Sequence, residues 1–219
     1  MNTHVIKREI NGIELSFTDI QHSLTVQSVF NELNNDCYGL EQISLSKNDT
    51  IIDVGANVGM FSIYAKKKFG CKIISFEPVP ENYNNFLFNI ELNGLSLDDF
   101  ELHNTAITNI ENGTIVIGTP LTNTGGSSVY HVGNISNTCN TETLSKYITD
   151  DCKYIKIDCE GGEYDIIPAI LNDLKNVKYI GIEYHKFNND QDPHKLHDTL
   201  ISIFNGEIYG SPSNFAYSY

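Results

Sequence analysis

A turn of small residues separates a strand from a helix between residues 50 and 69, and it is the strongest constraint in the sequence. The stretch Thr50–Val54 is apolar or β-branched except for Asp53, and Met60–Phe69 has apolar residues at helical spacing. The turn Gly55–Gly59 lets a ligand approach the backbone, and the start of the helix presents free N–H groups. The pattern predicts an α/β fold with a ligand site at this corner.

Further strands and helices alternate along the chain. A second unit combines a strand over Lys72–Glu77 with a helix over Pro80–Leu92, which starts at a proline and is followed by Asn93 and Gly94. Three more strands are expected at Phe100–Asn104, Lys153–Asp158 and Val177–Tyr184, with a helix at Tyr164–Leu174. This alternation is typical of a parallel sheet, and 219 residues suffice for one domain over residues 1–219.

Three regions lie outside the regular core, which we expect over residues 50–185. Residues 1–48 should form an N-terminal cap with a strand pair and an amphipathic helix around Leu24–Leu33, which either covers one side of the pocket or caps the sheet. Residues 107–141, rich in Gly, Asn, Ser and Thr, should form a hairpin-like excursion at the rim of the sheet. The tail Phe204–Tyr219 should form an antiparallel edge hairpin.

Charge and composition narrow the expected partners. The chain has 14 Lys and Arg against 28 Asp and Glu, and its formal charge of −14 repels a polyanion, so no nucleic-acid substrate is expected. No apolar stretch approaches the roughly 20 residues that span a bilayer, and the first residues lack the apolar core of a signal peptide. Five cysteines without a C-x-x-C pair indicate reduced thiols. We therefore expect a soluble protein of the cytoplasm.

The residues around the turn favour an adenosine cofactor that carries positive charge. Glu77 ends the second strand, where a carboxylate can accept hydrogen bonds from both hydroxyls of a ribose. A dinucleotide fingerprint needs glycine at positions 55, 57 and 60, whereas this chain has Asn57 and Met60, and it contains no P-loop motif. Asp53 is a poor neighbour for a pyrophosphate but a good anchor for a cation. S-adenosylmethionine, with its sulfonium and ammonium groups, therefore suits the pocket best.

Three blocks of the chain carry a wider similarity. They are Ile52–Ser62, Phe76–Asn82 with Asn89 and Leu92–Gly94, and Ile155–Asp165. From about Thr50 to His185 the chain resembles the FkbM-type family of class I S-adenosylmethionine-dependent methyltransferases, and the Lys-Ile-Asp-x-Glu-Gly pattern of the third block is specific to this branch. The resemblance implies a Rossmann-like, doubly wound α/β fold with a mostly parallel sheet of about seven strands and one antiparallel edge strand.

The resemblance also implies roles for individual residues. The turn would hold the methionine part of the cofactor, Glu77 the ribose, and the strand end Asn104–Ala106 would lie beside the adenine. Asp158 would lie near the methyl donor and the acceptor. The implied cofactor-binding residues are Asp53, Gly55, Asn57, Gly59, Glu77, Pro78, Asn104, Ala106 and Asp158.

Methyl transfer is a direct displacement at carbon, so the protein has to align the acceptor and take up its hydroxyl proton. Asp158 and His185 are the candidate catalytic residues because both lie at carboxyl ends of expected strands, ahead of the less fixed His131 and Glu160. Asp158, Glu183 and His185 could together hold Mg²⁺, but no ligand spacing demands a metal, and none is expected.

The sequence thus predicts an S-adenosylmethionine-dependent O-methyltransferase that acts on a hydroxyl of a small molecule or saccharide. Two alternatives stay open. One is an N-methyltransferase of small molecules, and the other is a non-catalytic module that binds an adenosine cofactor.

Overall fold

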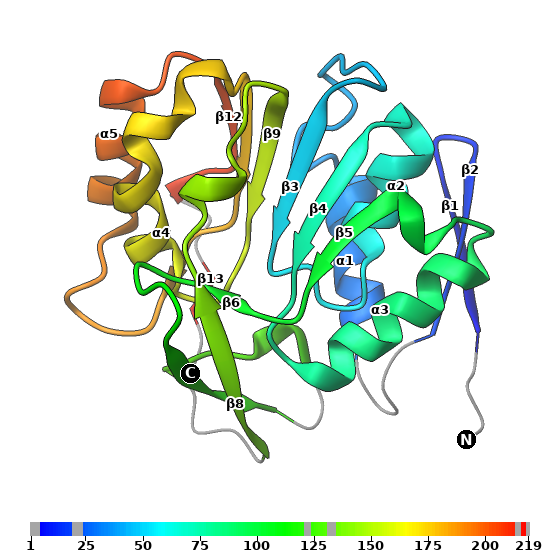
Figure 1. Cartoon of the computed structure of the whole chain (residues 1–219), viewed down its shortest axis with the longest axis horizontal. Helices are drawn as coiled ribbons and strands as arrows, with labels where there is room; N and C mark the ends of the chain where they lie inside the picture. Colours follow the sequence, from blue (N-terminus) through cyan, green and yellow to red (C-terminus); the bar gives the residue numbers. More distant parts are fainter. Residues whose placement is uncertain (1–4, 19–23, 121–123, 131–134, 213–215, 218–219) are drawn as a thin grey trace.

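A six-stranded sheet forms the centre of the computed structural model, which describes residues 5–18, 24–120, 124–130, 135–212 and 216–217. Its strands are β3 (Thr50–Val54), β4 (Lys72–Phe76), β5 (Phe100–His103), β9 (Cys152–Ile157), β10 (Tyr179–Ile182) and β12 (Glu207–Tyr209). They lie in the order β12-β10-β9-β3-β4-β5 (Figure 1). Counted along the chain from β3, this order is 3-2-1-4-5-6, which is the order of the Rossmann fold.

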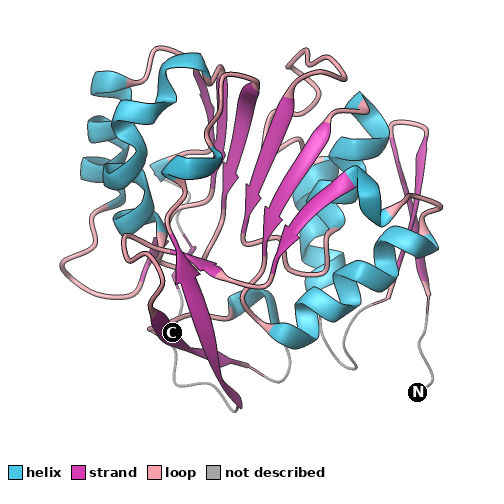
Figure 2. Cartoon of the chain, in the orientation of Figure 1, coloured by secondary structure: helices cyan, strands magenta, loops and turns pink. Residues whose placement is uncertain are grey.

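Helices cover both faces of this sheet (Figure 2). Ile51 and Ile73 pack into one core cluster with residues of the helices on one face, and their chain neighbours Ile52 and Ile74 pack into a second cluster on the other face. The helices are α1 (Thr25–Asn34), α2 (Met60–Phe69) and α3 (Pro80–Leu92) on the first face, and α4 (Glu163–Ile170) and α5 (Pro193–Ile203) on the second. Within the described ranges, no helix is long and apolar enough to cross a membrane. The helices on both faces of the sheet (Figure 2) confirm the predicted doubly wound α/β fold.

The expected antiparallel edge is wrong for the part of the chain that the structure describes. All neighbouring strands of the central sheet pair in parallel, and there are six of them rather than about seven. The tail forms no antiparallel hairpin in the residues described: β12 pairs in parallel with β10, and β13 (Ala216–Tyr217) pairs in parallel with β11 (His185–Lys186). The physical reason is α5, because a helical crossover between strands returns the chain in the same direction.

The N-terminal cap and the rim excursion have the expected form. β1 (Ile6–Ile10) and β2 (Ile13–Phe17) form an antiparallel pair, followed by α1. In the excursion, β7 (Thr114–Thr119) pairs antiparallel with β8 (Ile135–Glu142), and β6 (Ala106–Ile107) pairs in parallel with β8. The excursion lies below the carboxyl ends of the central strands in Figure 1.

The central strands carry much of the buried apolar surface, and Ile155 in β9 tests this. Its side chain is fully buried, so Ile155→Ala should lower the free energy of unfolding by about 2–5 kcal/mol through lost transfer energy and a residual cavity. Ile201→Ala, at a position 51% exposed on α5, is the control and should change stability by less than about 0.5 kcal/mol. Denaturant unfolding at neutral pH measures both. Equal effects of the two substitutions would contradict the described core.

Candidate functional site

The carboxyl ends of β3, β4 and β9 face a cavity of about 740 Å³. It lies where the strand order reverses between β3 and β9, which is where open α/β sheets bind ligands. The cap helix α1 contributes Ser28, Val29 and Glu32 to its walls, and the rim excursion contributes Ile117 and Ser128. The helix α1 therefore covers one side of the pocket and, through Val26 and Leu33, also packs into the core cluster on that face of the sheet.

The turn after β3 forms one wall of the cavity. Gly55, Asn57 and Gly59 have φ angles of 80°, 50° and 85°, a left-handed conformation that favours glycine and tolerates asparagine. A Cβ atom at Gly55 would lie 1.8 Å from the backbone oxygen of Asp158, and one at Gly59 would lie 1.9 Å from the ring of Phe86. The absence of side chains at both glycines thus brings β3, β9 and α3 into close contact around the turn.

Glu77, just after β4, presents a buried carboxylate to the cavity. Its oxygens accept hydrogen bonds from the backbone N–H of Asn57 at 2.7 Å and of Val79 at 2.9 Å, and from the Asn82 amide at 3.4 Å. Burial raises the pKa of Glu77 to about 7, although these hydrogen bonds act to lower it. Glu77 is therefore oriented by the same turn that shapes the cavity.

Two polar atoms in the cavity wall lack partners among the described residues. They are Oδ1 of Asn82 and Oγ1 of Thr105, and both residues line the cavity. Asn104, next to Thr105, donates its amide to the backbone oxygens of Glu77 and Pro78 at 2.8 and 3.1 Å. Unpaired buried polar atoms are costly, and both lie in the wall between β4 and the residues that follow β5.

Asp53 pairs with a lysine in the sheet. Lys156 Nζ lies 3.3 Å from Asp53 Oδ1 and 3.2 Å from Asp158 Oδ2, and it donates to the backbone oxygen of Gly55 at 3.0 Å. The other oxygen of Asp53 accepts a hydrogen bond from Ser62 at 2.6 Å. Burial acts to lower the pKa of Lys156, but the charges of Asp158 and Asp53 outweigh it and raise the pKa. The ammonium group of Lys156 therefore lies beside the carboxylate of Asp53.

Asp158 and His185 meet at the opposite end of the cavity from Glu77. Asp158 Oδ1 lies 4.0 Å from His185 Nε2, and Oδ2 accepts a hydrogen bond from the Tyr38 hydroxyl at 3.1 Å. Burial acts to raise the pKa of Asp158, but the positive charges of Lys156 and His185 outweigh it, and the pKa is lowered. The structure thus brings the two expected catalytic residues together in one wall.

Glu163 fixes the orientation of His185. Its carboxylate accepts backbone hydrogen bonds from Cys159 at 3.2 Å and Gly161 at 2.9 Å, and Nδ1 of His185 donates to it at 2.9 Å. The opposite ring nitrogen, Nε2, is then directed at the cavity. Burial acts to lower the pKa of His185, but the hydrogen bond and charge of Glu163 outweigh it and raise the pKa to about 10.

Three further carboxylates surround this end of the cavity. From the sequence, Glu160 is a weaker catalytic candidate, Glu183 is one of three residues that could hold Mg²⁺, and Glu32 has no expected role. Burial raises the pKa of Glu160 to about 7 and also raises the pKa of Glu32. The charge of Asp158, together with burial, raises the pKa of Glu183 to about 8. All three residues line the cavity, so its Asp158 end carries more acidic than basic side chains.

The expected site residues fall into two groups. Those that line the cavity are Gly55, Asn57, Glu77, Pro78, Ala106, Asp158 and His185. Three expected residues are not among the lining residues: Asp53, Gly59 and Asn104. Asp53 pairs with the lining residue Lys156, and Asn104 donates its amide to the backbone of the lining residue Glu77. Gly59 is the N-cap of α2. His131, a weaker candidate, lies outside the described residues.

The sequence matches a known protein family and two curated proteins. A family model described as the methyltransferase FkbM domain matches residues 53–213. The methyltransferase sdnD of Sordaria araneosa is 39% identical over 86 residues, which are 38% of this chain and 32% of that protein. Methyltransferase 1 of Beauveria bassiana is 35% identical over 75 residues, 33% of this chain and 29% of that protein. The matched parts of the chain thus span about a third of these curated relatives.

A solved structure shares the fold. The S-adenosylmethionine-dependent methyltransferase from Agrobacterium tumefaciens superposes with a TM-score of 0.51 and 9% sequence identity, over 93% of this chain and 60% of that one. The similarity supports the Rossmann-like architecture of the central sheet.

The buried lysine between the two aspartates generates a prediction. Lys156→Met would leave Asp53 and Asp158 without their shared cation, and we expect the free energy of unfolding to fall by about 3–5 kcal/mol. Lys195→Met, on the exposed side of α5, is the matched control and should change it by less than about 0.5 kcal/mol. Denaturant unfolding at neutral pH measures both variants. A loss below about 1 kcal/mol in Lys156→Met would mean that the pair is solvated like a surface ion pair.

Proposed function

The chain belongs to the FkbM methyltransferase domain family, and from this membership we propose that it transfers a methyl group from S-adenosylmethionine to a hydroxyl group of a small molecule or saccharide. The observation that carries the proposal is one continuous cavity with Glu77 at one end and the Asp158–His185 pair at the other. In our proposal residues 1–219 act as one methyltransferase domain, with the cofactor-binding core over residues 50–185.

The residues at the Glu77 end fit the adenosine half of the cofactor. The Glu77 carboxylate would accept hydrogen bonds from the ribose hydroxyls, and Asn82 Oδ1 and Thr105 Oγ1 offer unsatisfied polar atoms along the same wall. Pro78 and Ala106 supply apolar surface for the adenine. The turn Gly55–Asn57 would lie beside the methionine part. Its backbone N–H groups donate to the Phe76 oxygen and to Glu77, so contact would come from its van der Waals surface rather than from free N–H groups.

The residues at the other end would act on the acceptor. When bound, the cofactor supplies a methyl group on a sulfonium; the acceptor oxygen forms a bond to that carbon while the carbon–sulfur bond breaks. Asp158 and His185 would hold the acceptor hydroxyl in line with the methyl group. The proton would pass to one of them, and because the pKa of His185 is raised to about 10, His185 must first lose its own proton to act as this base. Tyr38, Lys156 and Glu163 position this pair through the contacts described above.

Calorimetry with S-adenosylmethionine and its demethylated product S-adenosylhomocysteine, alongside NAD, tests cofactor use. We expect micromolar binding of the first two alone. Methyl-labelled cofactor with matched panels of hydroxyl and amine acceptors then separates O-methylation from N-methylation. Binding without transfer to any acceptor would favour the non-catalytic module, and no binding by the folded protein would refute the cofactor assignment.

The ribose contact predicts a pH dependence. The ionised Glu77 carboxylate is the better acceptor for ribose hydroxyls, so below its pKa of about 7 the free protein must lose a proton to bind. Affinity for S-adenosylhomocysteine should therefore fall by up to about tenfold per pH unit as pH drops below 7. Calorimetry between pH 5.5 and 8.5 measures it.

Glu77→Gln provides the comparison for this profile. The variant should bind weakly across the range, and its difference from the unmodified protein should shrink as pH falls. A constant difference at all pH values would contradict a titrating ribose contact.

A substitution at the acceptor end of the cavity should change kcat rather than cofactor affinity. His185→Gln keeps a polar side chain but removes the imidazole, and we expect kcat to fall by about 10²–10⁴ with cofactor affinity changed less than about threefold. Steady-state kinetics with the acceptor found in the panel measures the first, and calorimetry measures the second. Unchanged kcat would remove His185 from the catalytic pair.

A further inference from the structure

We propose that Asp158, Glu183 and His185 form a binding site for a divalent cation, with Glu160 as an additional ligand. The site is at the acceptor end of the cavity, so its place in the reaction rests on the proposed function. While a cation is bound, Nε2 of His185 would be a ligand, so His185 would act as proton acceptor only in the cation-free protein. Cation binding itself needs neither cofactor nor acceptor and can be measured separately. No ligand spacing in the sequence requires a metal; the proposal comes from the three-dimensional arrangement.

The donor atoms have the separation that a cation needs. One ligand atom from each of Asp158, Glu183 and His185 lies within 4.8 Å of the others. From His185 Nε2 the distance is 4.0 Å to Asp158 Oδ1, 3.9 Å to Glu183 Oε1 and 3.5 Å to Glu160 Oε1. In an octahedral site with bonds of about 2.1 Å, ligand atoms lie about 3 to 4.2 Å apart. The three distances from His185 Nε2 fall within this range, and the bound of 4.8 Å on the set as a whole means that the carboxylates would have to move slightly inward to close the site.

His185 is prepared as a ligand independently of the acidic residues around it. Its side chain is 2% exposed, and its Nδ1 donates to Glu163, which is held in turn by two backbone N–H groups. Its Nε2 makes no hydrogen bond to any atom of the described chain and faces the carboxylates of Asp158, Glu160 and Glu183. A histidine with a carboxylate on one nitrogen and the other directed at oxygen ligands is the common arrangement around protein-bound metals.

The local charges favour a cation at this position. Lys156 shares its charge between Asp53 and Asp158 and does not form an ion pair with Glu160 or Glu183 among the described contacts. Asp158, Glu160 and Glu183 are half-buried acidic side chains that face one imidazole, and an added positive charge would stabilise them. One imidazole with several carboxylates suits a six-coordinate ion such as Mn²⁺ better than tetrahedral zinc, which prefers more nitrogen and sulfur ligands.

Binding of Mn²⁺ tests the site. Electron paramagnetic resonance reports free Mn²⁺, and titration of the full chain should show one ion bound per chain, with or without saturating S-adenosylhomocysteine. Asp158→Asn, Glu183→Gln and His185→Gln should each weaken binding at least tenfold. Glu163→Gln, which removes the support of His185 without removing a ligand, should weaken it by about 10- to 100-fold.

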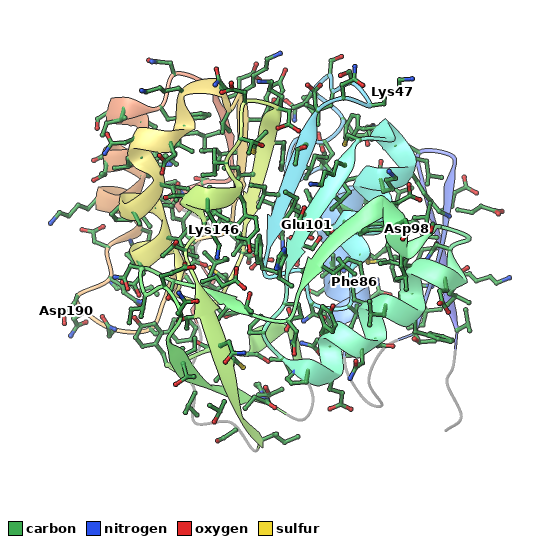
Figure 3. All side chains as sticks on the ribbon, viewed as in Figure 1. Lys47, Phe86, Asp98, Glu101, Lys146 and Asp190 are labelled. Carbon is green, nitrogen blue, oxygen red and sulfur yellow. The ribbon has the colours of Figure 1, made fainter. Side chains whose placement is uncertain are left out.

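Glu101→Gln is the matched control, because Glu101 lies on the outer strand β5 (Figure 3) in an ion pair with Lys72. It should leave the Mn²⁺ affinity unchanged. Circular dichroism and thermal unfolding of each variant verify the fold, and Co²⁺ absorption gives a second signature of a histidine ligand that His185→Gln should abolish.

The outcomes separate this proposal from the proposed function. No stoichiometric Mn²⁺ binding, or binding equally strong in all ligand variants, would overturn the cation site while leaving cofactor binding intact. Mn²⁺ binding that depends on these residues in a protein that does not bind S-adenosylhomocysteine would support the site and refute the proposed function.

Discussion

The ammonium group of Lys156, held between Asp53 and Asp158, is the interaction on which the site depends. Asp53 belongs to β3, Lys156 to β9 and Asp158 to the residue after β9, so the three charges join the two strands where the sheet order reverses. Because Gly55 also accepts a hydrogen bond from Lys156, the same side chain fixes the turn that shapes the cavity. Removing one member would leave an unpaired buried charge, so the arrangement is stable only as a unit.

The cavity built on this unit has two electrostatically different ends. At the Glu77 end, the carboxylate receives two backbone N–H groups, and the neighbouring unpaired atoms are neutral. At the Asp158 end, Glu32, Glu160 and Glu183 add carboxylates that Lys156 does not neutralise. The Glu77 wall, with one carboxylate among neutral groups, suits a nucleoside, and the wall rich in acidic side chains suits positive charge. One cavity can therefore orient a long, unevenly charged ligand without any covalent anchor.

Local patterns predicted what depends on local sequence. The bounds of β3, α2 and α3 follow from apolar spacing and from Pro80, and the structure has them at the predicted residues. The direction of the edge strand β12 depends on the crossover through α5, and no short sequence pattern predicts that direction. The proximity of Lys156 to Asp158 could have been predicted from the sequence, because alternate residues of a strand share a face and Lys156 precedes Asp158 by two residues. Glu163 and His185, 22 residues apart, meet only through the fold.

Hydroxyl methylation and an anionic wall are in conflict unless a cation is present. An acceptor that loses its proton beside Asp158, Glu160 and Glu183 adds negative charge to a group of carboxylates, and such like charges repel strongly in a buried site. The imidazolium of His185 offsets part of this charge only while it keeps its proton on Nε2, the same atom that faces the carboxylates. A divalent cation in that position would supply two positive charges without depending on a proton. The electrostatics of the acceptor end thus connect the proposed reaction to the proposed cation site.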